Sequence, residues 1–183
     1  MTHITPLPRE ALSDPEMQEL IAQAEALGVP DDTFARIIAR SPPHAKPLMR
    51  ALLMSHAEGN VDHRLKEIVR ILLARFAGDD YFAALRSRKA REMGLDETRI
   101  EAGCGDYEDS ASFTEAEKCA LRYADQMYLD ATKVDAAFYA ELKTHFSEAQ
   151  IMELGAFIAF HYGMQMFMRS LGAAAPASPA APP

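Results

Sequence analysis

The chain has 183 residues, a formal net charge of −8 and 49% hydrophobic residues. This length fits one domain with a sizeable core, and an acidic chain with scattered basic residues is a poor candidate for binding nucleic acid. No apolar run reaches the roughly 18 residues of a membrane span, and the polar N-terminus does not resemble a signal peptide. Cys104 and Cys119 are the only cysteines and form no C-x-x-C unit, so we expect reduced thiols in a cytoplasmic protein.

Capping residues and apolar periodicity predict helices along almost the whole chain. Asp14 and Pro15 start the first helix and Gly28 ends it, while Gly59 ends the third. Thr114 and Ser147 each begin a capping box. The predicted helical segments are 13–28, 31–41, 46–59, 62–78, 78–95, 114–130 and 148–171. The fourth is apolar on more than one side, which indicates a central helix.

No segment alternates apolar and polar residues for long enough to predict a strand. The C-terminal segment 173–183 is rich in Ala and Pro and has nothing large to bury, so we expect a flexible tail. The sequence therefore predicts an all-α protein with one helical domain over residues 1–172.

An arginine interrupts the apolar row of the predicted helix 78–95. Phe82, Arg86, Ala90 and Met93 follow helical spacing, so Arg86 is expected on the buried side. Such a cation would either bind an anionic substrate or form a structural ion pair.

The predicted last helix is apolar on nearly every side, yet carries two polar residues at buried spacing. His161 and Gln165 continue a stripe that otherwise consists of apolar residues, namely Ile151, Leu154, Ile158 and Met168. A buried imidazole and a buried amide both need hydrogen-bond partners, which makes them candidates for a site.

The segments "HRLKEIVRILLARFAG" and "AREMGL", followed by "FTEAEKCALRYADQM" and "FSEAQIMELGAFIAFHYGM", resemble the carboxymuconolactone decarboxylase and alkylhydroperoxidase D (AhpD) family. The resemblance covers about two-thirds of the chain and implies an AhpD-like helical bundle. It also implies a homo-oligomer, a trimer or hexamer, and a small organic acid or lactone as the substrate.

The family's peroxidase members use a glutamate, two cysteines in C-x-x-C and a histidine four residues after the second cysteine. Glu67 matches the glutamate, whereas Asp79 and Phe82 stand at the cysteine positions and Arg86 at the histidine position. A thiol relay needs a thiolate and a nearby resolving thiol. A thiol peroxidase is therefore the least favoured function.

Glu67, Arg86 and His161 are the candidate catalytic residues. Arg86 has a planar fork suited to a carboxylate or enolate, and it could instead pair with Glu67, Asp79 or a neighbouring subunit. Glu67 could act as an acid or base with a pKa raised by apolar surroundings, or pair with Arg70 or Arg86. His161 could carry a proton near neutral pH or be a hydrogen-bonded core residue.

Arg86 is also a candidate for binding substrate. The other candidate substrate-binding residues are Tyr81, Phe82, Tyr162 and Gln165. His56 and His63 are separated by the helix-breaking segment "AEGN", and no metal-binding motif surrounds them. We therefore expect neither a metal nor another cofactor.

Taken with the resemblance, these residues predict a cofactor-independent lyase, decarboxylase-like, or an isomerase acting on a small organic acid or lactone. The alternative is a protein of the same fold without catalysis, which binds a small acid or serves in an assembly. An enzyme should bring Glu67, Arg86 and His161 to one cavity, whereas a structural protein should pair them with one another.

Overall fold

The structure is a computed structural model that describes residues 2–174. Within that range every regular element is a helix. The helices are α1 (Pro15–Leu27), α2 (Asp32–Ile38), α3 (Pro42–Ala57), α4 (His63–Ala77), α5 (Asp80–Ala84), α6 (Arg88–Glu92), α7 (Glu97–Cys104), α8 (Glu115–Leu129), α9 (Ala136–His145) and α10 (Glu148–Ser170), with 3-10 turns η1 (Arg9–Ala11) and η2 (Ala131–Lys133). The all-α prediction is confirmed.

The predicted caps hold the helix ends. The Asp14 carboxylate accepts hydrogen bonds from the first backbone N–H groups of α1, and Gly28 ends that helix with a φ of 86°, a conformation that favours glycine. Both capping boxes form, with Thr114 starting α8 and Ser147 starting α10. These capping residues therefore define where α1, α8 and α10 begin.

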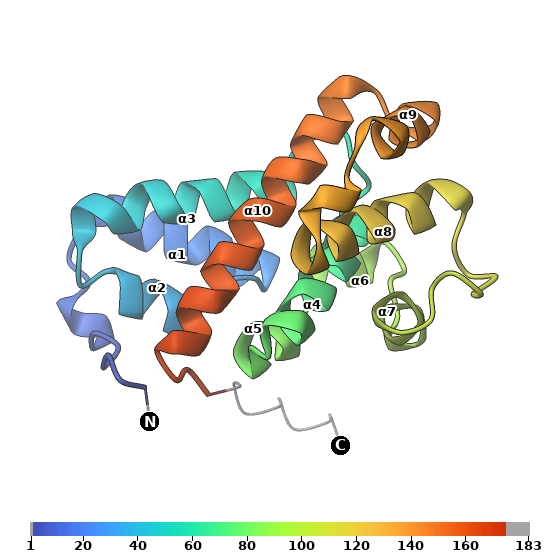
Figure 1. Ribbon diagram of the computed structural model, residues 1–183. Coiled ribbons are helices and arrows are strands. Elements are labelled where there is room, and N and C mark those ends of the chain that lie inside the picture. The colour runs from blue at the N-terminus through green and yellow to red at the C-terminus, as the bar shows by residue number, and fades with distance from the viewer. Residues whose placement is uncertain (1, 175–183) are drawn as a thin grey trace, which may run out of the picture.

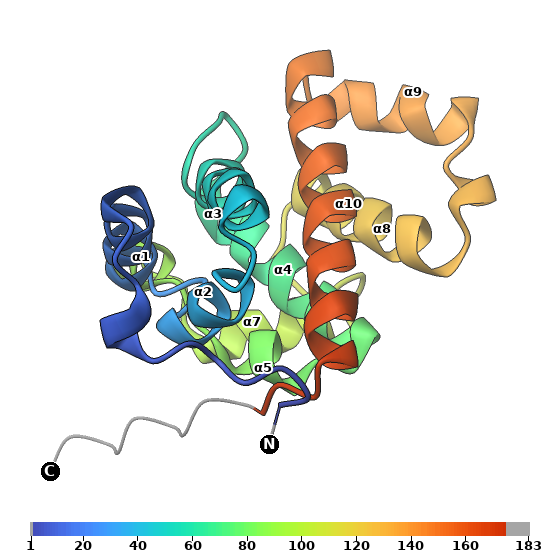
Figure 2. The same cartoon turned by 90° about the vertical axis from the view of Figure 1, so that its left-hand side faces the viewer.

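The two central helices are α4 and α10, which pack against each other. Figures 1 and 2 show α10 running past α4, with α1, α2 and α3 on one side and α8 and α9 on the other. Of the fifteen residues of α4 all but Arg64, Arg75 and Phe76 are buried, which confirms that it is central. None of the helices described here is long and apolar enough to span a membrane.

The apolar core has two parts, and α4 and α10 contribute to both. One part packs α1, α2 and α3 against α5 and the C-terminal end of α10. The other packs α4 against α7, α8 and the N-terminal half of α10. The functional candidates discussed below come from α3, α4 and α10 and from the link between α5 and α6.

The predicted single helix over 78–95 is wrong, because the chain there forms α5 and α6 with a break between them. Leu85 and Ser87 adopt extended backbone conformations, and the Ser87 hydroxyl caps α6 by accepting from Ala90 N. The carbonyls of Phe82 and Leu85, released by the break, accept hydrogen bonds from the Arg70 guanidinium. The buried Arg70 side chain on α4 therefore supplies hydrogen bonds to carbonyls at the C-terminal end of α5.

The expected tail 173–183 falls outside the described residues except for Ala173 and Ala174. Ala173 packs against the first part of the core.

Candidate active site

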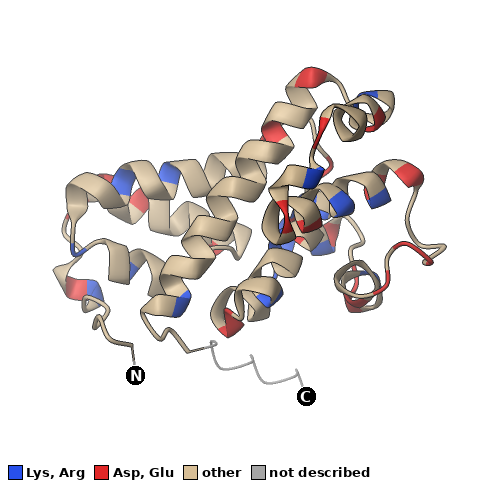
Figure 3. Ribbon diagram, viewed as in Figure 1, with Lys and Arg blue, Asp and Glu red and all other residues tan. Residues whose placement is uncertain are grey.

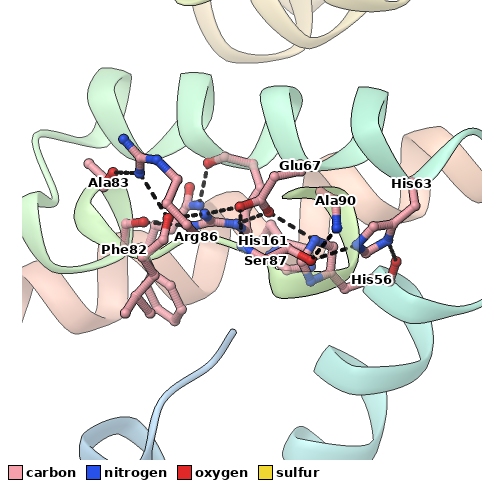
Figure 4. Close-up of polar contacts among 12 residues, drawn as sticks. His56, His63, Glu67, Phe82, Ala83, Arg86, Ser87, Ala90 and His161 are labelled. Carbon is pink, nitrogen blue, oxygen red and sulfur yellow. Dashed lines mark hydrogen bonds and ion pairs between the residues drawn. The ribbon is translucent and has the colours of Figure 1, made fainter. Parts of the chain in front are cut away.

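Seven polar side chains lie buried together where α3, α4 and α10 meet the link between α5 and α6. We call this group the buried polar cluster; its members are His56, His63, Glu67, Arg70, Ser87, His161 and Gln165. Each of them is at most 5% exposed. Figure 4 shows the imidazoles of His56, His63 and His161 near the Glu67 carboxylate.

Glu67 is the anionic centre of the buried polar cluster. Its carboxylate accepts from Arg70 Nε at 2.8 Å and from Arg70 Nη2 at 2.9 Å, and also from the Ser87 backbone N–H at 2.8 Å. Burial alone would raise the pKa of Glu67, but the charge and hydrogen bonds of Arg70 hold that pKa well below its ordinary value. Of the two alternatives that the sequence left open, the structure therefore shows the pairing with Arg70 and not a raised pKa, so Glu67 is ionised at neutral pH.

His56, from α3, approaches the same carboxylate. Its Nε2 lies 3.0 Å from Glu67 Oε2, within ion-pair distance, although the two groups are not aligned as a hydrogen bond. Burial lowers the pKa of His56 even though the carboxylate opposes this shift. The imidazole is therefore neutral, and the carboxylate favours the tautomer that carries its proton on Nε2. His56 Nδ1 is buried without a partner in the described part of the chain.

His63 and Ser87 fix the link between α5 and α6. His63 Nδ1 lies 2.8 Å from the His56 carbonyl, which can only accept, so this nitrogen carries the proton. His63 Nε2 therefore accepts from the Ser87 hydroxyl at 2.7 Å. Burial lowers the pKa of His63 to about 4, which agrees with a neutral ring. Ser87 thus contacts both His63 and Glu67.

His161 and Gln165 reach the cluster from α10. The Ser55 hydroxyl donates to the Leu52 carbonyl at 3.2 Å, so its oxygen accepts from His161 Nε2 at the longer distance of 3.4 Å. Burial lowers the pKa of His161 well below its ordinary value. The Gln165 amide nitrogen donates to the Arg70 carbonyl at 2.8 Å, and its Oε1 is buried without a partner among residues 2–174.

Arg86 does not lie on a buried helical row, because it falls in the break between α5 and α6. Its Nε donates to both Glu97 oxygens, at 3.0 and 3.1 Å, and its Nη1 donates to the carbonyls of Ala83 and Leu85. Figure 4 places Arg86 at the opposite end of the group from His63. The arginine that pairs with Glu67 is Arg70, which was one of its two alternative partners expected from the sequence, Arg70 and Arg86.

The predicted aromatic site residues lie outside the buried polar cluster. The Tyr81 hydroxyl bonds to the Asp31 carboxylate and accepts from Phe34 N at 3.0 Å, and the Phe82 ring packs 5.6 Å from the ring of Phe34. These two residues join α5 to α2. Tyr162 faces a different hollow of about 220 Å³, which is lined by Leu73, Met127, Tyr128, Ile158 and Ala159.

Arg70, Ser87, His56 and His63 were not among the site residues predicted from the sequence. His56 and His63 flank a helix break, and that break returns the chain so that their rings lie 4.6 Å apart. The sequence feature that could have indicated this pair is a histidine on each side of the turn at Gly59. Within the described range, no three His, Cys, Asp or Glu side chains are arranged to hold a metal ion.

Comparison with solved structures gives the fold. The debrominase Bmp8 in complex with 2,3,4-tribromopyrrole superposes with a TM-score of 0.81 at 20% identity, covering 97% of this chain and 93% of that one. An uncharacterized peroxidase-related protein from Ralstonia eutropha, described as an AhpD core, gives 0.76 at 13% identity, covering 94% and 92%. A putative AhpD-type antioxidant defence protein from Agrobacterium tumefaciens gives 0.66 at 19% identity, covering 77% and 96%.

These matches confirm the AhpD-like fold expected from the sequence. No model of a known protein family matches the chain, and no curated protein matches it. At these identities the likeness concerns the fold, so the chemistry must be argued from the buried polar cluster itself.

Proposed function

We propose that this protein is a cofactor-independent lyase, decarboxylase-like, or an isomerase that moves a proton on a small organic acid or lactone. The observation that carries the proposal is the 3.0 Å approach of a neutral, buried imidazole, His56, to an ionised carboxylate, Glu67. The solved neighbours include a debrominase of this fold, a variant of which was solved in complex with the small ring compound 2,3,4-tribromopyrrole.

His56 would take the proton. With Nε2 protonated and facing Glu67, Nδ1 is the free basic nitrogen of the ring. When Nδ1 removes a proton from a carbon next to a carbonyl, the ring becomes an imidazolium and its charge is stabilised by the Glu67 carboxylate. The same proton then returns to a second carbon of the substrate in an isomerisation. In a decarboxylation no C–H bond breaks: the carboxylic acid passes its proton to Nδ1, the bond to the carboxyl carbon breaks to release CO₂, and the imidazolium returns the proton to the carbon that carried the carboxyl group.

His161 would stabilise the oxygen on which negative charge develops. Its Nε2–H is directed at Ser55 Oγ through a long contact of 3.4 Å, which a substrate carbonyl oxygen would readily replace. A neutral imidazole that donates to a developing enolate lowers the barrier without adding a full charge. Arg70 keeps Glu67 ionised and in place, which makes it a positioning residue.

The role of anion anchor, expected for Arg86, is not part of the proposed mechanism. The Arg86 guanidinium is engaged by Glu97 and two carbonyls, and a substrate carboxylate would have to displace Glu97. Phe82 and Tyr81 support α5 and contact α2, so we propose that they shape the site only indirectly.

The test is proton exchange in D₂O, followed by ¹H NMR over a panel of small lactones, ketones and organic acids. The parent protein should exchange one C–H position in at least one compound. His56→Gln and Glu67→Gln should each lower that rate by roughly 10²- to 10⁴-fold, the usual effect of a lost general base. His145→Gln, at the exposed end of α9, is the matched control and should leave the rate unchanged.

Exchange that persists at the parent rate in both His56→Gln and Glu67→Gln would overturn the proposal. An absence of exchange over the whole panel would instead favour the noncatalytic alternative, a protein that binds a small molecule or serves in an assembly.

A further inference from the structure

The cations in and around the buried polar cluster are already paired. The Arg70 guanidinium is shared between two oxygens of Glu67 and the carbonyls of Phe82 and Leu85. Lys66, next to Glu67 on α4, is 1% exposed, and its ammonium is bound by Glu153 and by the carbonyls of Ser55 and Glu58. An incoming anion would therefore lose its hydration without meeting an available cation.

Apart from His56 Nε2, which faces Glu67 without an aligned hydrogen bond, the buried side-chain atoms of the cluster that lack a partner among residues 2–174 are acceptors. Gln165 directs its amide N–H to the Arg70 carbonyl, so the free atom of that side chain is the carbonyl oxygen Oε1. His56 Nε2 lies 3.0 Å from Glu67 Oε2, and in the tautomer that this carboxylate favours the other ring nitrogen, Nδ1, is a bare acceptor without a partner. Two buried acceptors without donors are costly, and they are satisfied by a ligand that supplies N–H or O–H groups.

We propose that the buried polar cluster selects an uncharged cyclic carbonyl compound that carries a hydrogen-bond donor, such as a lactam or a hydroxylated lactone, over a carboxylate. This inference rests on the proposed function and chooses among its substrates. The ring carbonyl accepts from His161 Nε2–H, and the N–H or O–H of the ligand donates to Gln165 Oε1. The half-buried Ser55 and Phe160, beside His161, lie at the outer edge of this site.

An acid could enter this site in one other way, by bringing a proton. A carboxylic acid that transfers its proton to His56 or His161 would bind as a carboxylate beside an imidazolium. Its affinity measured against total ligand would then rise about tenfold for each unit of falling pH above the acid's own pKa, because binding takes up one proton. An uncharged ligand carries no such dependence as long as the histidines stay neutral.

Three compounds of one skeleton separate charge from hydrogen bonding. They are 2-piperidone, a lactam with an N–H; δ-valerolactone, which has a ring oxygen in place of that N–H; and 5-hydroxypentanoate, the opened anion. Dissociation constants are measured by ligand-observed NMR at pH 6.5 and 7.5 on the parent protein and on Gln165→Met, which removes the acceptor. His145→Gln serves as the control.

We expect 2-piperidone to bind the parent at least tenfold more tightly than 5-hydroxypentanoate, with δ-valerolactone between them. Gln165→Met should abolish the advantage of the lactam over the lactone, and the control should retain it. Tighter binding of the anion, anion binding that strengthens tenfold per pH unit, an unchanged preference in Gln165→Met, or no binding by the lactam would each overturn the inference. If the lactam binds selectively but no compound exchanges a proton, the inference stands and the proposed function is refuted. If proton exchange occurs on an acid that binds more tightly than the lactam, the proposed function stands and the inference is refuted.

Discussion

Glu67 Oε2 and His56 Nε2 lie 3.0 Å apart, and neither side chain is more than 1% exposed. The carboxylate stays ionised because Arg70 binds it through two nitrogens, whereas the imidazole stays neutral because it is buried. One helix, α4, supplies both the carboxylate and the guanidinium, and α3 supplies the imidazole. This arrangement holds a base beside a fixed negative charge.

Arg70 and Arg86 should differ strongly in their contribution to stability. Arg70→Met removes the cation that pairs with the buried Glu67 carboxylate and one hydrogen bond to each of the Phe82 and Leu85 carbonyls, so the free energy of unfolding should fall by about 3–5 kcal/mol. Arg86→Met breaks an ion pair whose partner, Glu97, is 54% exposed, and should cost less than about 1 kcal/mol. Urea denaturation of both variants provides the comparison. Equal losses would contradict these assignments.

Asp79 should make the protein less stable above pH 6. Burial raises the pKa of this carboxyl to about 6, so between its ordinary value of 3.8 and 6 the folded state binds more protons than the unfolded state, and stability falls as pH rises through this interval. Asp79→Asn keeps an oxygen that can accept from Tyr81 N. At pH 7 it should raise the free energy of unfolding by about 1–3 kcal/mol.

At pH 4 the advantage of Asp79→Asn should largely disappear. Urea denaturation at both pH values measures it, and Asp80→Asn, at the exposed neighbouring position, is the control. A variant that is less stable than the parent at pH 7 would show that the charged form of Asp79 is needed.

The sequence predicted the local features of this fold and missed its long-range ones. Asp14, Thr114 and Ser147 start the helices they were expected to start, because a cap depends on residues within one turn. The break at Leu85 and Ser87 was missed because it depends on Arg70, which precedes it by more than ten residues and occupies the released carbonyls.

The same distinction holds for the site. Glu67, His161 and Gln165 were singled out by their position on apolar faces, and all three lie in the buried polar cluster. Their catalytic or binding roles remain predictions. His56 and Ser87 join them only through tertiary packing, which helical spacing does not report.

The protein should lack thiol-dependent peroxidase activity. Burial raises the pKa of both Cys104 and Cys119 to about 11, so almost no thiolate is present at neutral pH. Asp79 and Phe82 occupy the positions that resemble those of the family's cysteines. Reduction of a hydroperoxide by a dithiol donor measures the activity. Turnover that disappears in the Cys104→Ser and Cys119→Ser double variant would contradict this prediction.

The outer face of α10 supports the proposed homo-oligomer, a trimer or hexamer. Met152 is 71% exposed on this face, and Met166 and Phe167 are 39% and 43% exposed. Figure 3 shows the charged residues of α10 only towards its two ends, and no Lys, Arg, Asp or Glu lies between Glu153 and Arg169. Exposed apolar surface of this kind is typical of contacts between chains.

The trimer or hexamer implied by the family resemblance would give three or six times the monomer mass of 20.2 kDa in light scattering at micromolar concentration. The double variant Met166→Glu and Phe167→Glu should dissociate, while Met54→Glu, at an exposed methionine of α3, should not. A parent protein that remains monomeric would rule out the oligomer.

The protonation state of His56 tests the central claim most directly and requires no substrate. In ¹⁵N NMR spectra of histidine-labelled protein, the His56 ring should be neutral at pH 7, protonated on Nε2 and bare on Nδ1, because burial lowers its pKa. Glu67→Gln should remove this tautomer preference, whereas His145→Gln should leave it intact. An imidazolium at pH 7, or a neutral ring protonated on Nδ1, would show that His56 does not offer a free basic nitrogen beside the Glu67 carboxylate, which contradicts the account.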